Sequence, residues 1–300
     1  MKRFFKRIIP GTARSGLLLI VVSCIIAGSL YFARSTVATP QAGEEVAIVP
    51  VKNIKIVTKQ PSRLEEIRRL AETDHIGLLK MALAEYDKKN IKSYTCRFIK
   101  QEKLRGRLHE EQHVDVKFLA EPFCVAMTWV KNAPKADAIV YVEGKFPNSK
   151  GRCQMVVRPT SGFLQWLVGG SVLRLPDGDD VMQNTLKPCT QFGFRNTLLS
   201  LIEVYEDAAA HGECEMKFAG MAKIDGHDCL VIERHLPYRP EYPAMKTVVY
   251  IELDNLLPLE IWGYDWKGEL TSHYAYHDVN LAADLSINDF SPKANGIKGH

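Results

Sequence analysis

The sequence lacks the short motifs that mark several large classes of enzyme. None of its seven cysteines forms a CxxC pair, which argues against a zinc site and against a thioredoxin-like redox site. It contains no GxSxG nucleophile motif, no glycine-rich phosphate loop, no internal repeat and no low-complexity tract. Because nothing in the sequence assembles an acid, a base and a nucleophile, we expect a protein that is not an enzyme, with no cofactor and no metal.

Acidic residues are absent from residues 1–34, which carry six Lys and Arg. The whole chain has 39 Lys and Arg against 35 Asp and Glu, so its net charge of +4 belongs to this N-terminal segment alone. The remainder is slightly acidic, and we therefore expect no nucleic acid partner.

Residues 16–33 form an uncharged apolar run of 18 residues. As a helix it would span about 27 Å, close to the thickness of a bilayer core. Three interpretations remain: an uncleaved signal anchor, a cleaved signal peptide with a site near Thr36–Ala38, and a lipoprotein signal at Val21–Cys24. With the basic flank on the cytoplasmic side, all three place the body in the cell envelope, outside the cytoplasmic membrane.

The rest of the chain divides into three parts. Residues 35–61 contain three prolines and no amphipathic period, which predicts an extended stalk. Residues 62–292 carry the patterns of a folded domain, and residues 293–300 read as a tail. Ser62 and Glu65 form a capping-box pattern, so a helix is predicted over about residues 63–88, with a break near residues 73–77.

Alternating apolar residues predict about ten antiparallel strands. The clearest are three consecutive strands within residues 246–279, joined by turns at Asp254-Asn255 and Lys267-Gly268. A second helix is predicted over residues 196–211. The expected fold class is therefore α+β: a curved antiparallel β-sheet covered by helices, preceded by one N-terminal membrane helix.

One string, His109-Glu110-Glu111-Gln112-His113, matches the HExxH pattern of zinc proteases. The alternating run of residues 114–118 follows it without a break, which predicts a strand. Residues four apart in a strand are roughly 13 Å apart, too far to share one metal. A zinc hydrolase at residues 109–113 is therefore only a remote alternative.

Aromatic and apolar residues are frequent on the predicted strands, and they fit either a plain core or the lining of a cavity for an apolar ligand. Residues 163–168 lie between glycines and fit either a short buried helix or a mobile lid over that cavity. The candidate ligand-binding residues are Phe98, Trp129, Tyr141, Phe163, Trp166, Leu167, Trp262 and Tyr264.

The six cysteines outside the apolar run also leave two possibilities. Most fit small buried side chains. If a disulfide forms, Cys214 and Cys229 are the favoured pair, because they lie on neighbouring predicted strands.

Several motifs resemble a bacterial envelope family of unknown function, DUF1571. They are strung in the order of that family: Glu121-Pro122-Phe123-Cys124-Val125-Ala126-Met127-Thr128-Trp129, Ile139–Gly144, Gln191–Phe194 and Leu257–Leu259. The resemblance covers about residues 78–290, and the family is similar to the LolA/LolB lipoprotein-carrier superfamily. It implies a half-barrel in which helices cover an apolar cavity, over residues 62–292. Unlike the carriers, this chain has a predicted membrane helix and stalk.

We therefore expect a non-enzymatic envelope protein that binds a lipid or the acyl chains of a lipoprotein. The alternative is an interaction or sensor domain with a filled core that docks another envelope protein. Residues 16–33 would contact the membrane in either case.

Overall fold

The computed structural model describes residues 62–299. The predicted membrane helix at residues 16–33 and the stalk at residues 35–61 lie outside these residues. Within the described range, no helix has both the length and the hydrophobicity to cross a bilayer. Thr58–His300 forms one compact unit, and both larger core clusters lie within it.

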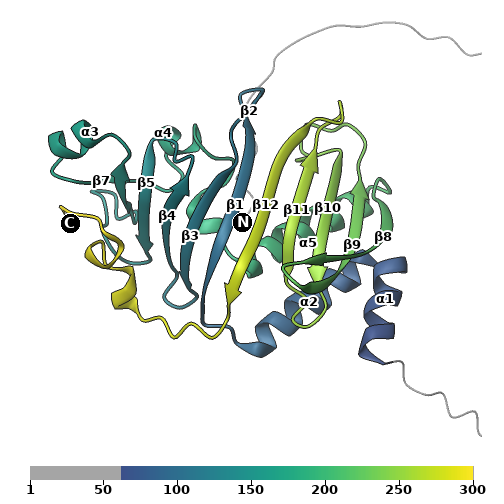
Figure 1. Cartoon of the computed structure of the whole chain (residues 1–300). Coiled ribbons are helices and arrows are strands. Elements are labelled where there is room, and N and C mark those ends of the chain that lie inside the picture. The colour runs from purple at the N-terminus through teal and green to yellow at the C-terminus, as the bar shows by residue number, and fades with distance from the viewer. Residues whose placement is uncertain (1–61, 300) are drawn as a thin grey trace, which may run out of the picture. The chain divides into compact units, whose positions relative to one another are not determined.

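The core of this unit is a 12-stranded, fully antiparallel sheet that curves open (Figure 1). Its order is β7-β6-β5-β4-β3-β1-β12-β11-β10-β9-β8, with β2 paired to β1. The strands are β1 (Ser93–Leu104), β2 (Arg107–Leu108), β3 (Gln112–Leu119), β4 (Cys124–Lys131), β5 (Ala136–Val142), β6 (Met155–Pro159), β7 (Val172–Arg174), β8 (Glu215–Ile224), β9 (His227–His235), β10 (Lys246–Glu252), β11 (Pro258–Tyr264) and β12 (Leu270–Asn280). The predicted α+β class and the meander β10–β12 are confirmed.

Within residues 62–299, the sheet joins the first strand to the last. β1 pairs with β12 in the middle of the sheet, so that Phe98 lies opposite Tyr276 (Figure 1). Two meanders therefore meet at one seam, and residues from both ends of the domain share one core.

The N-terminal helices follow the predicted pattern closely. α1 (Arg63–Thr73) begins with the capping box of Ser62 and Glu65. Asp74 ends α1 and caps α2 (His75–Lys89) by accepting a hydrogen bond from the backbone N–H of Gly77. The break therefore falls at Asp74, inside the predicted interval.

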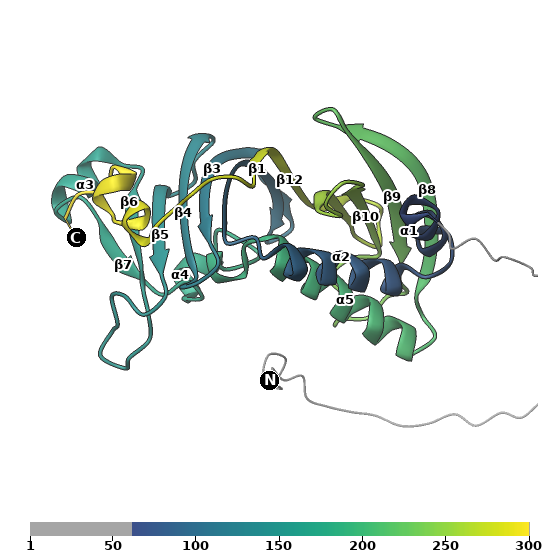
Figure 2. The same ribbon diagram turned by 90° about the horizontal axis from the view of Figure 1, so that it is seen from below.

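The long helix α5 (Phe194–Ala210) packs beside α2 on one face of the sheet (Figure 2). Phe194 contacts Tyr276 of β12 at a ring-centroid distance of 4.5 Å, and the guanidinium of Arg234 in β9 lies 4.8 Å from the Tyr205 ring. We call this side of the sheet the helix-covered face, and the other side the opposite face.

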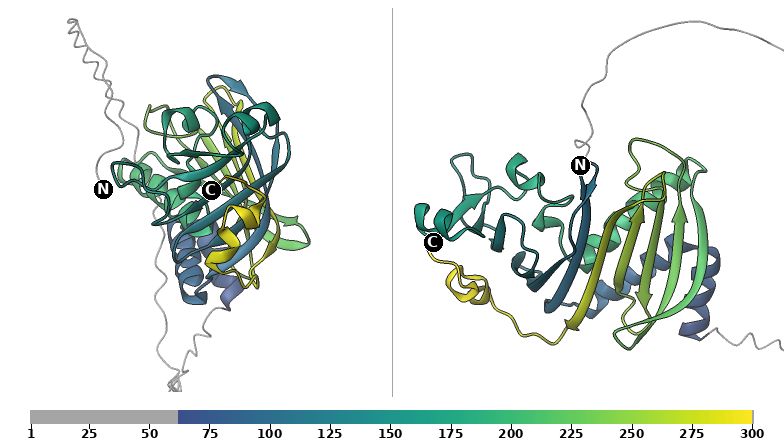
Figure 3. Two further views of the ribbon diagram at one scale, coloured as in Figure 1. Left: turned by 90° about the vertical axis from the view of Figure 1, so that its left-hand side faces the viewer. Right: turned by 45° about the horizontal axis from the view of Figure 1, so that its top comes forward.

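The C-terminal residues form part of the domain and are not a free tail. After β12, the chain crosses the opposite face as two 3-10 turns, η2 (Ile287–Phe290) and η3 (Lys293–Asn295) (Figure 3). Phe290 and Ile297 are buried there against β4, β5 and β6. The folded domain thus extends beyond the predicted boundary at residue 292.

The favoured disulfide between Cys214 and Cys229 does not form. All six described cysteines are free. Glu215 pairs with His235 at one end of the β8–β9 hairpin, whereas Cys229 pairs with Ala222 near the other end. The prediction is wrong because neighbouring strands bring two residues together only when the register also matches.

Candidate functional site

The helix-covered face has two kinds of cover. α2 and α5 lie over the strands from β1 to β9, as Figure 2 shows. The β3–β6 side is covered instead by residues 175–193, which we call the cover segment. It contains only two short helices, α4 (Asp179–Met182) and η1 (Cys189–Gln191).

The cover segment touches the sheet through a few apolar contacts. The Cys189 Sγ lies 3.8 Å from the Sδ of Met155 in β6. Phe192 packs edge-on against Phe98 of β1, with ring centroids 5.2 Å apart, and Val181 packs against the same core. Leu186 of the segment remains exposed.

Three of the eight predicted ligand-binding residues lie on this face. Phe98 and Trp129 both lie directly opposite Val114 in the pairing register, and Tyr141 lies opposite Val125. Phe98 is buried, whereas Trp129 and Tyr141 are partly exposed at the edge of the core. The Trp129 Nε1 donates a hydrogen bond of 2.7 Å to the Oε1 of Gln112.

Trp262 and Tyr264 belong to the opposite face, so they cannot line the same cavity. Trp262 pairs with His273 and stacks on the His273 ring at a centroid distance of 3.6 Å. His273 is adjacent to Tyr274 in β12, so the two side chains point to different faces of the sheet. The Lys246 Nζ lies 4.6 Å from the centroid of the Tyr264 ring. Sequence alternation groups residues within a strand but leaves open which face each strand turns to the helices.

Phe163, Trp166 and Leu167 lie in a third place. They belong to α3 (Gly162–Leu167), which follows β6 at the far end of the sheet and has no buried residue (Figure 1). The predicted buried core helix is wrong, because the large side chains of this segment are exposed to solvent. The alternative of a mobile lid stays a prediction.

A buried polar cluster beneath the cover segment was missed by the sequence analysis. The Lys100 Nζ lies 3.0 Å from a Glu102 carboxylate oxygen and donates a hydrogen bond of 3.0 Å to the Oγ1 of Thr185. The Tyr274 hydroxyl donates to the Glu102 Oε1 over 2.8 Å. Burial, followed by the nearby Glu102 charge, raises the pKa of Tyr274 well above its usual value.

The sequence did contain a signal for this cluster. Lys100 and Glu102 continue the alternation of Tyr94, Cys96 and Phe98, so their side chains share the buried side of β1. A charged pair in phase with core residues indicates a buried ion pair.

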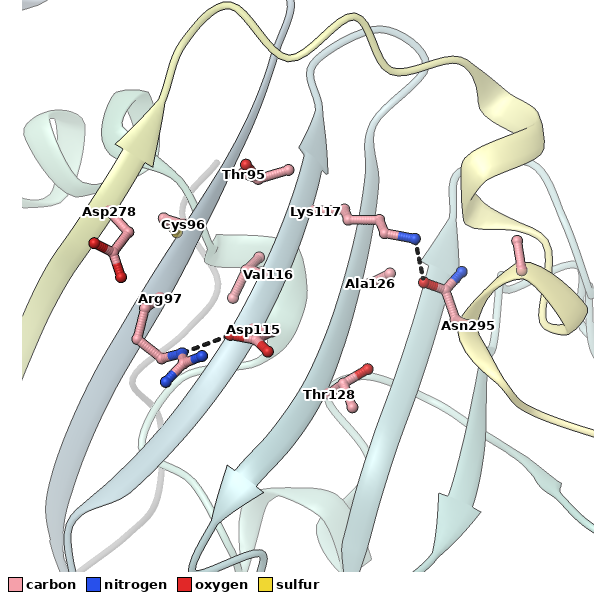
Figure 4. A pocket seen from close by; sticks show the side chains of 11 residues that line it. Thr95, Cys96, Arg97, Asp115, Val116, Lys117, Ala126, Thr128, Asp278 and Asn295 are labelled. Carbon is pink, nitrogen blue, oxygen red and sulfur yellow. Dashed lines mark hydrogen bonds and ion pairs between the residues drawn. The ribbon is translucent and has the colours of Figure 1, made fainter.

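Two hollows differ in chemistry. The one on the helix-covered face is about 100 Å³, and half of its lining residues are aromatic: Tyr86, Phe118, Phe123 and Phe192. The other is an open groove of about 540 Å³ on the opposite face, beside η3 (Figure 4). Its polar lining includes the ion pair of Arg97 with Asp115, and Lys117, which donates to Asn295 over 3.2 Å.

The HExxH string is not helical in this structure. His109 precedes β3, His113 lies within it, and the His113 Nε2 is 2.8 Å from a carboxylate oxygen of Glu111. Among the described residues, one group could bring metal ligands together: His227, Glu252 and Asp254, within 4.8 Å of one another. Glu252 already accepts backbone N–H bonds of 2.7 Å from Asp254 and Asn255, so its carboxylate organises the β10–β11 turn.

Comparison with known families agrees with the motifs of the sequence. The family model described as "Protein of unknown function (DUF1571)" matches residues 91–297. The chain belongs to this family. The DUF1571 match includes β1 to β12, the cover segment and both C-terminal turns. No curated protein matches the chain.

Solved structures similar to this DUF1571 chain include the Pseudomonas aeruginosa MucA/MucB complex, at 14% identity and TM-score 0.43, covering 74% of this chain and 62% of that one. An uncharacterized conserved protein from Thermus thermophilus matches at 11% identity and TM-score 0.40, covering 70% and 91%. The LolA superfamily protein NE2245 from Nitrosomonas europaea matches at 14% identity and TM-score 0.29, covering 72% and 98%. The chain thus spans less than two thirds of the MucB-containing match.

Proposed function

We propose that the domain is a non-enzymatic envelope protein that binds a lipid, or the acyl chain of a lipoprotein, beneath its cover segment. The observation that carries this proposal is the unequal cover of the sheet. Long helices close one half of the helix-covered face, and a segment with little regular structure closes the other.

The side chains beneath the cover segment are those that an acyl chain would contact. They include Met127, Trp129, Ile139, Tyr141, Met155 and Val157, all members of or packed against the main core. Moving residues 175–193 away would expose this surface to a ligand while leaving α2 and α5 in position. Segments with few buried contacts open at lower free energy than the core does.

Ligand entry requires such a movement. The hollow of about 100 Å³ on this face is smaller than the roughly 300–1,000 Å³ of typical ligand pockets. The polar cluster of Lys100, Glu102 and Thr185 would hold the cover segment closed when no ligand is present.

The same small hollow also supports a second candidate function. A domain whose core is already filled would act through its surface, as an interaction or sensor domain for another envelope protein. The two candidates differ in whether the covered surface ever opens to a lipid.

The proposal also covers where in the cell the protein is located. We infer an envelope protein held at the cytoplasmic membrane through residues 16–33, or exported after cleavage of that segment. The basic N-terminal residues and the uncharged run that follows them support either arrangement.

A fragment of residues 58–300 is suitable for the test, because it contains the whole compact unit. Binding of a fluorescent fatty acid to this fragment would be compared between Trp129→Ala and Trp262→Ala. Both remove a partly exposed tryptophan from a strand, but on different faces. We expect Trp129→Ala to weaken binding at least about tenfold, or ~1.4 kcal/mol, and Trp262→Ala to leave it unchanged.

Equal affinities in the two variants, or no binding by the unaltered fragment, would reject the ligand-binding function. The filled-core interaction domain would then be the better account.

A further inference from the structure

α3 turns its large apolar side chains to solvent, unlike a typical surface helix of a soluble domain. Such helices usually turn their apolar residues inward and their polar residues to water. In α3 and the residue that follows it, Phe163, Trp166 and Leu167 are 68%, 77% and 62% exposed, and Leu164 and Val168 are also exposed. We call these five side chains the apolar tip.

The one polar side chain of α3, that of Gln165, faces the domain instead. Gln165, the only residue of α3 that is partly buried, donates a hydrogen bond of 2.7 Å to the carbonyl of Pro159. Ser161 caps the helix, and the backbone N–H of Gly170 donates to the carbonyl of Gln165 over 2.6 Å. These bonds hold α3 in the orientation that leaves the apolar tip in solvent.

Two lysines approach the segment that carries the apolar tip. Residues 159–173 contain no charged residue. Lys135 accepts a backbone hydrogen bond of 3.0 Å from Thr160, and Lys298 lies against Gly170 and accepts a bond from the Ser171 hydroxyl. Both lysines are exposed, and neither side chain has a hydrogen-bond or ion-pair partner among the described residues.

We propose that the apolar tip inserts into the surface of an anionic lipid bilayer, with Lys135 and Lys298 beside the lipid headgroups. Trp, Phe and Leu next to Lys are the residues that bind helices to the boundary between headgroups and acyl chains.

The size of the apolar tip argues against a second copy of this chain as the occupant. Stable protein interfaces bury roughly 800 Å² on each partner, through some 20–30 residues. The apolar tip offers five side chains on one short helix at the end of the sheet. A bilayer needs no matching surface, and the two flanking lysines complement anionic headgroups.

This inference is independent of whether a lipid binds beneath the cover segment, because no residue of α3 lines the hollow near Phe192 or belongs to the main core. The fragment of residues 58–300 is again the right protein for the test, since it omits the apolar run at residues 16–33, which would bind membranes by itself. Flotation with vesicles of phosphatidylglycerol would be compared with flotation with vesicles of phosphatidylcholine.

We expect the fragment to float with phosphatidylglycerol vesicles and much less with phosphatidylcholine vesicles. Phe163→Ser with Trp166→Ser should reduce flotation at least about tenfold, because it removes two of the largest apolar side chains from the insertion. Lys135→Glu with Lys298→Glu should reduce binding to the anionic vesicles. Met221→Ser with Tyr238→Ser is the matched control, since both residues are also exposed but lie elsewhere, and it should leave flotation unchanged.

A second readout separates insertion from simple adhesion. Trp166→Phe keeps an aromatic residue in the apolar tip but removes its indole. Brominated lipids should quench the tryptophan fluorescence of the unaltered fragment. In Trp166→Phe most of this quenching should be lost, while flotation persists. No flotation of the unaltered fragment, or equal flotation of the Phe163→Ser, Trp166→Ser variant, would overturn the proposal. Dimerisation that depends on the apolar tip, without flotation, would assign it to a second copy and overturn it equally.

Discussion

The Tyr274 hydroxyl donates a hydrogen bond of 2.8 Å to the Oε1 of Glu102, across the seam where the last strand of the sheet pairs with the first. Glu102 is 3% exposed and is also the partner of Lys100, which in turn holds Thr185 of the cover segment. One carboxylate therefore links the two meanders of the sheet to the cover segment.

Removing this carboxylate should be costly. Glu102→Ala leaves the buried Lys100 ammonium without its counter-charge, and we expect the free energy of unfolding to fall by about 3–5 kcal/mol. Tyr274→Phe removes one hydrogen bond to a charged group and should lower the free energy of unfolding by about 1.5–3 kcal/mol. Asp115→Ala breaks the exposed pair with Arg97 and should lose no more than about 1 kcal/mol. Urea unfolding of the fragment measures all three, and a smaller loss for Glu102→Ala than for Asp115→Ala would contradict this ranking.

Stability should fall in mildly acidic solution because of His75. Burial lowers the pKa of this residue, and its neutral ring donates from Nε2 to the Ala71 carbonyl over 2.8 Å. The unfolded chain therefore binds the proton more tightly than the folded one. The resulting loss of stability begins as the pH falls through the unfolded pKa of about 6.5 and continues down to the lower folded value.

His75→Gln should flatten this part of the stability curve. Unfolding free energies measured between pH 5 and about 7.5 would check it, with His109→Gln as a control at an exposed site. An unchanged slope in His75→Gln would assign the acid sensitivity to other groups.

The six cysteines of the fragment should all titrate as free thiols in denaturant. In the folded protein Cys124, Cys189 and Cys229 should react slowly, because burial raises the pKa of Cys189 to about 12 and of Cys124 and Cys229 to about 11, which leaves little reactive thiolate. Reaction with a chromogenic disulfide, followed before and after unfolding, gives the rate at which thiols react in the folded protein and the total number of free thiols. Four reactive thiols in denaturant would indicate a disulfide that the structure does not contain.

Gly193 should be intolerant of a side chain. Its φ is +112°, and a Cβ would lie 3.1 Å from the Phe118 ring, at the point where the cover segment leads into α5. Gly193→Ala should lower the unfolding free energy by about 1–3 kcal/mol. Gly162→Ala is the matched control, because its φ is not positive and no atom lies within 4 Å of the new Cβ. Similar thermal unfolding of the two variants would show that the backbone at residue 193 can relax.

Much of the fold could be predicted from local patterns. Ser62 and Glu65 identified the first helix, and the turns at Asp254-Asn255 and Lys267-Gly268 separated the strands of the last meander. These signals are local, because they depend on neighbouring residues and their hydrogen bonds.

The candidate site was harder to predict because it depends on long-range register. Trp129 and Trp262 look alike in the sequence, yet their strands turn them to different faces. Hydrophobicity alone also misassigned Phe163 and Trp166, since a stretch of apolar residues reads as core whether or not any other element covers it.

The most direct test of the ligand-binding function is the lipid content of the folded domain. The fragment of residues 58–300 would be exported, purified without detergent and extracted with organic solvent for mass spectrometry, with Trp129→Ala beside it. A bound lipid should be recovered in stoichiometric amount from the unaltered fragment and in reduced amount from the variant. A folded fragment that carries no lipid, and takes up none when lipid is supplied, would contradict the function proposed here.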